Sequence, residues 1–348
     1  MLPVRSGPLW MPSSGSGCRP VSDSFSLRTR PLREAAEDHL APAATRSRAS
    51  AGRARPEQPD DFRTAFERDR DRILHTKAFR RLKHKTQVFL NPEGDHFVTR
   101  LTHTLQVTQV ARSLAAALGL NEDLAEAIAL GHDVGHSPFG HIGEDALSPY
   151  IEGGWHHAAQ SVRIFEVLED KNLSVEVLDG IRAHSWKISP PPATPEGACV
   201  RYADRIAYLS HDALDAVRAG LLVEAEFPAD VRDRFGHAGS QMVGSMIDAV
   251  VSNSVLGDTV TMSAPDLAVM SDFREFMFER VYFSDHHLDH KAKAIRIIRD
   301  LVDLHHAKPD LMPATYRDHG TDTLSQAIDY VAGMTDRFAT STHARLCG

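Results

Sequence analysis

The sequence predicts an all-α protein with one main domain. Between residues 61 and 338, apolar side chains recur at spacings of three and four, which is the period of an amphipathic helix. Strand-like alternation is scarce, and no internal repeat is found. The 348 residues, 42% of them apolar and 25% charged, are enough to bury a sizeable core.

The first 58 residues differ in composition from the rest of the chain. They are rich in Pro, Ser, Gly, Ala and Arg and hold few large apolar residues, so they cannot bury a core of their own. We therefore expect a disordered tail over residues 1–58. Its start loosely resembles a transit peptide, but acidic residues enter at Asp23, and a disordered tail fits the composition better.

The main domain begins with a helical pattern from Phe62 to Gln87, which carries many Arg and Lys residues. The turn cluster Asn91–Asp95 follows it. These features are compatible with a small β-hairpin near residues 86–98.

A long helical pattern then runs from Leu101 to Leu118 and is ended by Gly119. Asn121 is a suitable N-cap for the next helix, which continues to Leu130. An exposed, proline-rich loop is expected over residues 189–195. Further helices are expected near residues 155–168, 174–182, 199–222, 229–251, 265–282, 290–305 and 321–338.

Charge and cysteine content narrow the class of protein. The net charge is −8, and because residues 1–60 hold nine Arg, no Lys and six acidic residues (+3), the remainder carries −11. Such an acidic domain gives no strong signal for general nucleic-acid binding, which relies on a basic surface. Cys18, Cys199 and Cys347 are far apart and odd in number, which favours a reducing compartment, so we expect a cytoplasmic protein. No apolar run approaches the roughly 18 residues of a membrane span.

The segment Gly131–Glu144 has the densest chemistry of the chain. It holds three histidines and two carboxylates among glycines and a proline, so the backbone is expected to bend rather than form a straight helix. The adjacent pair His132 and Asp133 offers a metal ion one imidazole nitrogen and one carboxylate oxygen. Two ligands do not complete a metal site, so others must come from elsewhere in the chain.

His103 and Asp204 can supply the missing ligands. A lone helical histidine is more often an ordinary surface or core residue, but antiparallel packing of neighbouring helices could bring His103 beside the His-Asp pair. Asp204 shares a helix face with Tyr208 and Asp212, because the three are spaced four residues apart. Two imidazoles and two carboxylates suit a divalent ion among Mg, Mn, Fe, Co, Ni and Zn.

His141 and Glu144 are expected to act as a coupled pair next to this metal. They lie three residues apart, so the carboxylate of Glu144 can orient the imidazole of His141, and the imidazole can then transfer a proton.

These motifs resemble the H…HD…D signature of the HD-domain metal-dependent phosphohydrolases and, more narrowly, the deoxyguanosine triphosphate triphosphohydrolase family. The resemblance covers about residues 61–285. Several motifs in the same order make it far more specific than a single His-Asp pair. The matching segments are Arg100–His103, Gly131–Glu144 and Ala203–Tyr208, together with Asp69–His75, Ala78–Leu82, Lys85–Phe89 and, more weakly, Phe273–Phe278.

The resemblance implies a helical HD domain over residues 59–285, with a C-terminal helical region, 286–348, packed on it. It also implies hydrolysis of a deoxynucleoside triphosphate to the deoxynucleoside and inorganic triphosphate. A deoxynucleoside triphosphate activator and a homo-oligomer are further expectations from the family. In the family's pattern the metal ligands are His103, His132, Asp133 and Asp204, and the catalytic group is His141, Glu144 and His157.

The same resemblance assigns the substrate-binding residues. Gln87 stands where the family reads the sugar, Arg100 where it binds phosphate, Tyr208 where it stacks near the ribose, and Asp212 where it accepts from the 3′-hydroxyl. Arg205 could hold phosphate oxygens through its planar guanidinium. For Arg80 and Arg81 we favour a structural network of ion pairs over phosphate binding.

One departure from the family pattern concerns Trp155–Gln160. Ala158 stands where the family usually has Asn, which leaves open whether His156 or His157 faces the phosphates. Two other functions also remain open. A related HD nucleotidase or phosphodiesterase would share the metal site but release phosphate or a nucleoside monophosphate, and a nucleotide-sensing or single-strand-binding module would use the site structurally.

Overall fold

The computed structural model describes residues 26–87, 98–282 and 288–348. This part of the chain forms sixteen α-helices and no strand; its only β pairing is two isolated bridges, one of them between Thr86 and Thr99. The all-α prediction is confirmed. Most of the hairpin predicted near residues 86–98 lies outside the described residues, although this bridge pairs its first residue with the residue that follows its last one. No helix in the described ranges is long and apolar enough to cross a membrane.

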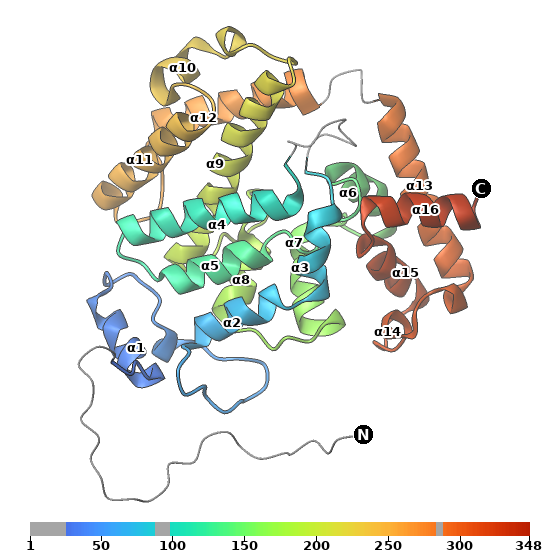
Figure 1. The fold of residues 1–348 in the computed structure, drawn as a ribbon, viewed down its shortest axis with the longest axis horizontal. Helices are drawn as coiled ribbons and strands as arrows, with labels where there is room; N and C mark the ends of the chain where they lie inside the picture. The colour runs from blue at the N-terminus through green and yellow to red at the C-terminus, as the bar shows by residue number, and fades with distance from the viewer. Residues whose placement is uncertain (1–25, 88–97, 283–287) are drawn as a thin grey trace, which may run out of the picture.

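Three helices form the centre of the fold (Figure 1). Helix α4 (Arg100–Ala117) packs against both α5 (Glu122–Gly131) and α9 (Pro195–Arg218). Their shared face is lined by small and branched side chains, and the buried ones form the main hydrophobic core. Each helix has an N-cap side chain that accepts from its first turn, supplied by Thr99, Asn121 and Thr194.

The remaining helices surround this centre. On one side lie α2 (Ala65–Leu74), α3 (Lys77–Arg81), α6 (His141–Leu147), α7 (His157–Arg163) and α8 (Val175–Ala183). One end carries α10 (Ala229–Phe235), α11 (Ser240–Gly257) and α12 (Ala264–Met277), and another side carries α13 (Leu288–Ala307), α14 (Ala314–Arg317), α15 (Thr323–Ala332) and α16 (Asp336–Leu346) (Figure 1). The N-terminal helix α1 (Arg30–Ala36) lies near α2, to which it is joined by an ion pair between Arg33 and Glu67.

Each of three predicted helices is divided into two α-helices in the structure. The pattern Phe62–Gln87 divides at Thr76, whose side chain caps α3. The pattern 229–251 divides between α10 and α11, where Gly236 and Gly239 take positive φ angles of 76° and 94°. The pattern 321–338 divides where Thr335 caps α16. In each case a turn or cap interrupts the helix while the apolar period continues across it.

Residues 26–58 pack on the helical core, so the expected disorder is wrong for them. The composition suggested disorder because large apolar residues are few. The segment is held instead by buried carboxylates: Glu37 accepts from Asn121 Nδ2 at 3.1 Å, and Glu196 accepts from the backbone N–H of Thr45 at 2.9 Å. A buried carboxyl group left without partners would be costly, so these hydrogen bonds can fix a segment that lacks an apolar face.

The C-terminal helices share a second hydrophobic core with the segment that follows the His-Asp motif. Helix α13 packs on α6, and Leu147 and Trp155 are buried with apolar side chains of α13 and α15. Polar contacts reinforce this junction. Buried Lys85 donates to the carbonyl oxygens of His136 and Ala332, which joins the motif to α15.

Candidate active site

The four predicted metal ligands converge from the three central helices. His103 lies in the first turn of α4, His132 and Asp133 directly follow α5, and Asp204 lies in α9. Nε2 of His103 is 3.1 Å from Oδ1 of Asp204 and 3.9 Å from Oδ2 of Asp133. Nε2 of His132 is 3.5 Å from Oδ1 of Asp133 and 3.8 Å from Oδ1 of Asp204. Ligands of one metal ion are separated by such distances.

The orientation of His132 fits a metal ligand. Its Nδ1 lies 2.6 Å from the carbonyl oxygen of Ala129, which can only accept, so Nδ1 carries the hydrogen. Nε2 then presents a lone pair, and it has no hydrogen-bond partner among the described residues although the side chain is fully buried. An unsatisfied buried nitrogen is costly, and a metal ion would satisfy it.

The carboxylates of the site are held in the ionised form. Burial opposes ionisation of Asp133, but the neighbouring histidines and Arg100 hold its pKa well below the usual range. Burial likewise opposes ionisation of Asp204, and its hydrogen bond with His103 and the other nearby imidazoles lower its pKa. Ionised carboxylates are the form that ligates a divalent cation. Arg100 Nη1 donates to Oδ2 of Asp133 at 2.7 Å, so this predicted phosphate-binding residue also positions a metal ligand.

The bend after the His-Asp pair carries His141 and Glu144 to the rim of the site. Phe139 and Gly140 take positive φ angles of 63° and 59°, which reverse the chain before α6 begins. A Cβ on Gly143 would lie 2.1 Å from the carbonyl oxygen of Pro138, so only glycine fits this close approach. The predicted bend is therefore present.

Glu144 joins the two predicted catalytic histidines. Its Oε2 lies 3.0 Å from Nδ1 of His141, and its Oε1 lies 3.3 Å from Nδ1 of His157. Burial opposes its ionisation, but the hydrogen bonds from the two histidines hold its pKa well below the usual range. Burial lowers the pKa of His157, but the hydrogen bond and charge of Glu144 outweigh it and raise that pKa. The arrangement can stabilise a positive charge on either imidazole.

The two histidines at the start of α7 lie differently. His157 is buried, and its Nε2 lies 4.0 Å from Oδ1 of Asp133. His156 keeps 30% of its side chain exposed, although its Nδ1 lies 3.2 Å from Oε1 of Glu144. Of the two, His157 therefore lies closer to the metal ligands. His141 remains 65% exposed and faces the pocket.

A pocket of about 650 Å³ opens beside these residues. Its volume lies in the range of sites for small molecules and cofactors. Eleven of the twelve predicted site residues line it; only His132 does not, because it lies beneath the others. The structure thus brings together Gln87, Arg100, His103, Asp133, His141, Glu144, His157, Asp204, Arg205, Tyr208 and Asp212.

The substrate-binding candidates line the pocket from two places: Gln87 lies next to Arg100, whereas the other three lie on α9. Oε1 of Gln87 is buried and has no hydrogen-bond partner within the described ranges, so it can accept from a ligand. Tyr208 and Asp212 follow Asp204 along the same face of α9. The guanidinium of Arg205 stacks on Trp186, with its central carbon 3.8 Å from the ring centroid, a favourable cation–π contact.

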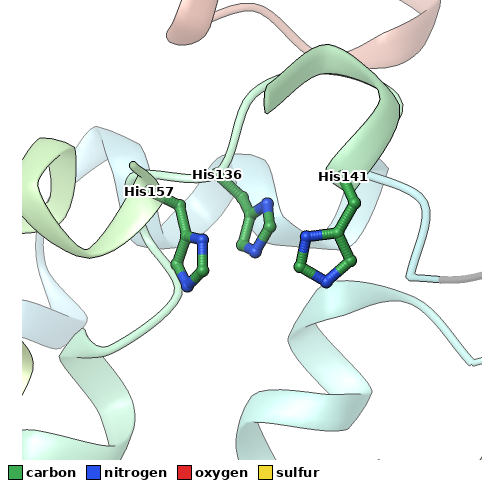
Figure 2. Close-up of side chains that lie close together, drawn as sticks. All are labelled: His136, His141 and His157. Carbon is green, nitrogen blue, oxygen red and sulfur yellow. The ribbon is translucent and has the colours of Figure 1, made fainter. Parts of the chain in front are cut away.

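Three pocket residues were missed or left unassigned in the sequence. Trp186 and His184 had no motif around them, and their roles follow only from the packing of α8 against α7 and α9. His136 was prominent in the motif but had no assigned role. Its ring stacks on His157 with centroids 3.9 Å apart, in a row with His141 (Figure 2).

Comparison with known proteins agrees with this geometry. Residues 100–209 match the HD domain, and residues 260–345 match the phosphohydrolase-associated domain. A deoxyguanosinetriphosphate triphosphohydrolase-like protein from Caldanaerobacter subterraneus subsp. tengcongensis is 46% identical over 308 residues, which cover 86% of this chain and 90% of that protein. A protein of the same name from Desulfatibacillum aliphaticivorans is 43% identical over 332 residues, with coverages of 89% and 95%.

The chain belongs to this family. The resemblance inferred from the motifs is confirmed, and the two matched regions place the chain among HD-domain phosphohydrolases. The HD match contains all four predicted metal ligands, and the phosphohydrolase-associated match contains α12 to α15 and all of α16 except its last residue. A solved structure of a hypothetical protein from Aquifex aeolicus aligns with a TM-score of 0.46 at 21% identity, covering 80% of this chain and 68% of that one.

Proposed function

We propose that this protein is a metal-dependent hydrolase that splits deoxynucleoside triphosphates into the deoxynucleoside and inorganic triphosphate. The observation that carries the proposal is the convergence of two imidazoles and two carboxylates at and beneath the wall of one pocket, which the His141–Glu144 pair also lines. The names of the relatives, deoxyguanosinetriphosphate triphosphohydrolase-like proteins, support this substrate class.

His103, His132, Asp133 and Asp204 would hold the divalent ion. Such an ion would supply Lewis acidity, which lowers the pKa of water and offsets the charge of the triphosphate. Arg100 keeps the carboxylate of Asp133 in place through its 2.7 Å hydrogen bond. Gln87, which lies next to Arg100, and Arg205, which lies on α9, would bind the sugar and phosphate groups.

The chemical step requires a proton for the leaving group. In the proposed reaction the oxygen of water bonds to the α-phosphorus, and the bond from that phosphorus to the 5′-oxygen breaks. Nδ1 of His141 is engaged by Glu144, so its Nε2 faces the pocket and can give a proton to the 5′-oxygen. The ionised Glu144 stabilises the protonated imidazole before the transfer, and the proton lost by water restores His141.

A product assay tests this proposal. The purified chain, loaded separately with Mg, Mn or Co, is incubated with each of the four deoxynucleoside triphosphates, alone and mixed, and the products are separated by chromatography. We expect equal amounts of deoxynucleoside and triphosphate, and none from His132→Ala. The control is His237→Ala, which removes an exposed histidine away from the pocket. Orthophosphate or a nucleoside monophosphate would indicate a different phosphohydrolase, and no product with any metal would indicate a nucleotide-sensing module.

A further inference from the structure

The C-terminal helix α16 places a carboxylate between two backbone segments that flank the pocket. Asp336 is the first residue of α16, directly after the capping residue Thr335. Its Oδ1 accepts from the backbone N–H of Phe139 at 3.0 Å. Its Oδ2 accepts from the backbone N–H of Thr86 at 2.9 Å and also from the hydroxyl of Thr86. One side chain therefore satisfies three donors, on residues that lie 197 and 250 positions away along the chain.

Phe139 is the residue at which the chain turns towards His141. Its φ angle of 63° lies in the left-handed region, which is unfavourable for a residue with a side chain. Such a backbone persists where the surrounding structure holds it. The N–H of Phe139 is held by Asp336, and its ring packs on the second hydrophobic core. Helix α6 begins two residues later with His141, so a displaced Phe139 would displace the imidazole.

Thr86 has the corresponding place next to Gln87, the residue expected to read the sugar. Thr86 also forms the isolated bridge to Thr99, which caps α4. Oε1 of Gln87 is buried and has no hydrogen-bond partner in the described parts of the chain. The location of this oxygen therefore depends on the backbone that Asp336 and Thr99 hold.

The two segments lie directly against each other. A Cβ on Gly140 would be 3.4 Å from the carbonyl oxygen of Gln87 and 3.8 Å from that of Thr86. Asp336 thus joins two neighbouring pieces of backbone, one leading to His141 and the other to Gln87. In the proposed reaction His141 gives a proton to the 5′-oxygen of the sugar that Gln87 is expected to contact. The spacing between these two side chains therefore decides how well the proton is aligned.

We propose that Asp336 is a positioning residue, which fixes the spacing between the imidazole of His141 and the amide of Gln87 through the backbones of Phe139 and Thr86. Asp336 is not among the residues that line the pocket, so it acts through these two segments rather than by contact with the substrate. The inference rests on the proposed function. It gives the C-terminal helices a part in catalysis, in addition to their place in the second hydrophobic core.

Asp322 shows what a helix-capping aspartate does elsewhere in the same region. It caps α15 and accepts from the backbone N–H of Ser325 at 3.0 Å and from its hydroxyl at 2.6 Å. These are the same kinds of donor that Thr86 offers to Asp336. The donors to Asp322, however, belong to its own helix, whereas those to Asp336 lie on the two segments at the pocket. Asp322 therefore provides the matched control for loss of a carboxylate at a helix N-terminus.

Steady-state kinetics with dGTP and GTP tests the inference. In Asp336→Ala we expect kcat for dGTP to fall about 10- to 100-fold, because a misplacement of about 1 Å can cost ~10²-fold in rate. The preference for dGTP over GTP, measured as the ratio of the two kcat/KM values, should fall as well, because Gln87 is no longer held. Asp322→Ala should keep kcat and the preference, although each change should lower Tm. A purely structural role of Asp336 would lower Tm alone.

Asp336→Asn keeps the size of the side chain and one acceptor oxygen, so it should show smaller changes in the same direction. It replaces Asp336→Ala if circular dichroism shows that the alanine chain does not fold. Parent values of kcat and of the dGTP preference in the folded variant would overturn the inference. Equal changes in Asp322→Ala would overturn it too.

Hydrogen–deuterium exchange measures the contacts of Asp336 without turnover. The backbone amides of Thr86 and Phe139 should exchange faster in Asp336→Ala than in the parent chain, and at the parent rate in Asp322→Ala. A parent chain that forms no deoxynucleoside and triphosphate would overturn the proposed function. Unchanged exchange in Asp336→Ala, with an active parent chain, would overturn the inference alone.

Discussion

The two ends of the pocket are built in different ways. At the metal end, His103 and His132 are almost fully buried and lie at helix ends, where backbone and carboxylate contacts fix their rings. At the other end, Arg205 and Trp186 are only partly buried and hold each other by stacking. The metal end is therefore preorganised for chemistry, whereas the other end can adjust to a ligand. Changes at the metal end should mainly lower kcat, and changes at the other end should mainly raise KM.

The largest effect is expected from His132→Ala. The change removes the unsatisfied Nε2 at the base of the metal position, so kcat should fall by roughly three orders of magnitude or more. Steady-state kinetics with dGTP measures the loss of kcat, and elemental analysis measures the loss of bound metal. A variant with the parent kcat and metal content would contradict the proposed metal site.

Glu144→Gln should come next. The amide keeps the shape of the side chain but removes the charge that faces His141 and His157. Since general acid–base catalysis contributes about 10²- to 10⁴-fold, kcat should fall within that range while KM changes little. Glu152→Gln is the matched control, because Glu152 is exposed and does not line the pocket. An unchanged kcat would remove Glu144 from the catalytic group.

Trp186→Leu tests the opposite end of the pocket. The loss of the stacked ring frees Arg205, so KM should rise about 3- to 10-fold while kcat stays near the parent value. Initial rates over a range of dGTP concentrations give both constants. A fall in kcat without a change in KM would contradict the division of the pocket into two ends.

Lys85→Met should have the smallest effect on catalysis and a clear effect on the pH dependence of stability. Burial lowers the pKa of Lys85 from 10.5 to about 7. A lowered lysine pKa means that the folded chain favours the neutral amine, whereas the unfolded chain keeps it protonated up to about pH 10.5. The folded state is therefore most stable above pH 10.5 and loses stability as the pH falls towards 7. The free energy of unfolding should therefore rise with pH between these values, by up to ~1.4 kcal/mol per pH unit.

Denaturant unfolding at several pH values measures this slope. Lys85→Met should remove it, and Lys83→Met, a change at an exposed neighbour, should keep it. An equal slope in the parent chain and in Lys85→Met would show that Lys85 stays protonated when folded.

The sequence predicted the metal ligands because the motifs that carry them are short stretches of the chain. The structure contains each predicted feature: the His-Asp pair, the glycine-bounded bend, and one helix face shared by Asp204, Tyr208 and Asp212. Trp186 and His184 could not be found in this way, because only the packing of α8 places them at the pocket.

Helix boundaries and the N-terminal segment show the same limit. The apolar period continues across Thr76 and Gly236 and so predicted unbroken helices. In the structure the helix is interrupted at Thr76, which caps α3, and at Gly236, which has a positive φ angle. Composition alone suggested disorder for residues 26–58, because buried carboxylates such as Glu37 leave no apolar pattern to detect. Contacts made by polar side chains at long sequence separation are what the sequence did not reveal.

The most direct test of the central claim is hydrolysis of dGTP in ¹⁸O-labelled water. Attack of water on the α-phosphorus predicts that the label appears in the inorganic triphosphate and that the deoxyguanosine stays unlabelled. Label in the 5′-hydroxyl of deoxyguanosine, or release of a labelled nucleoside monophosphate, would contradict the account.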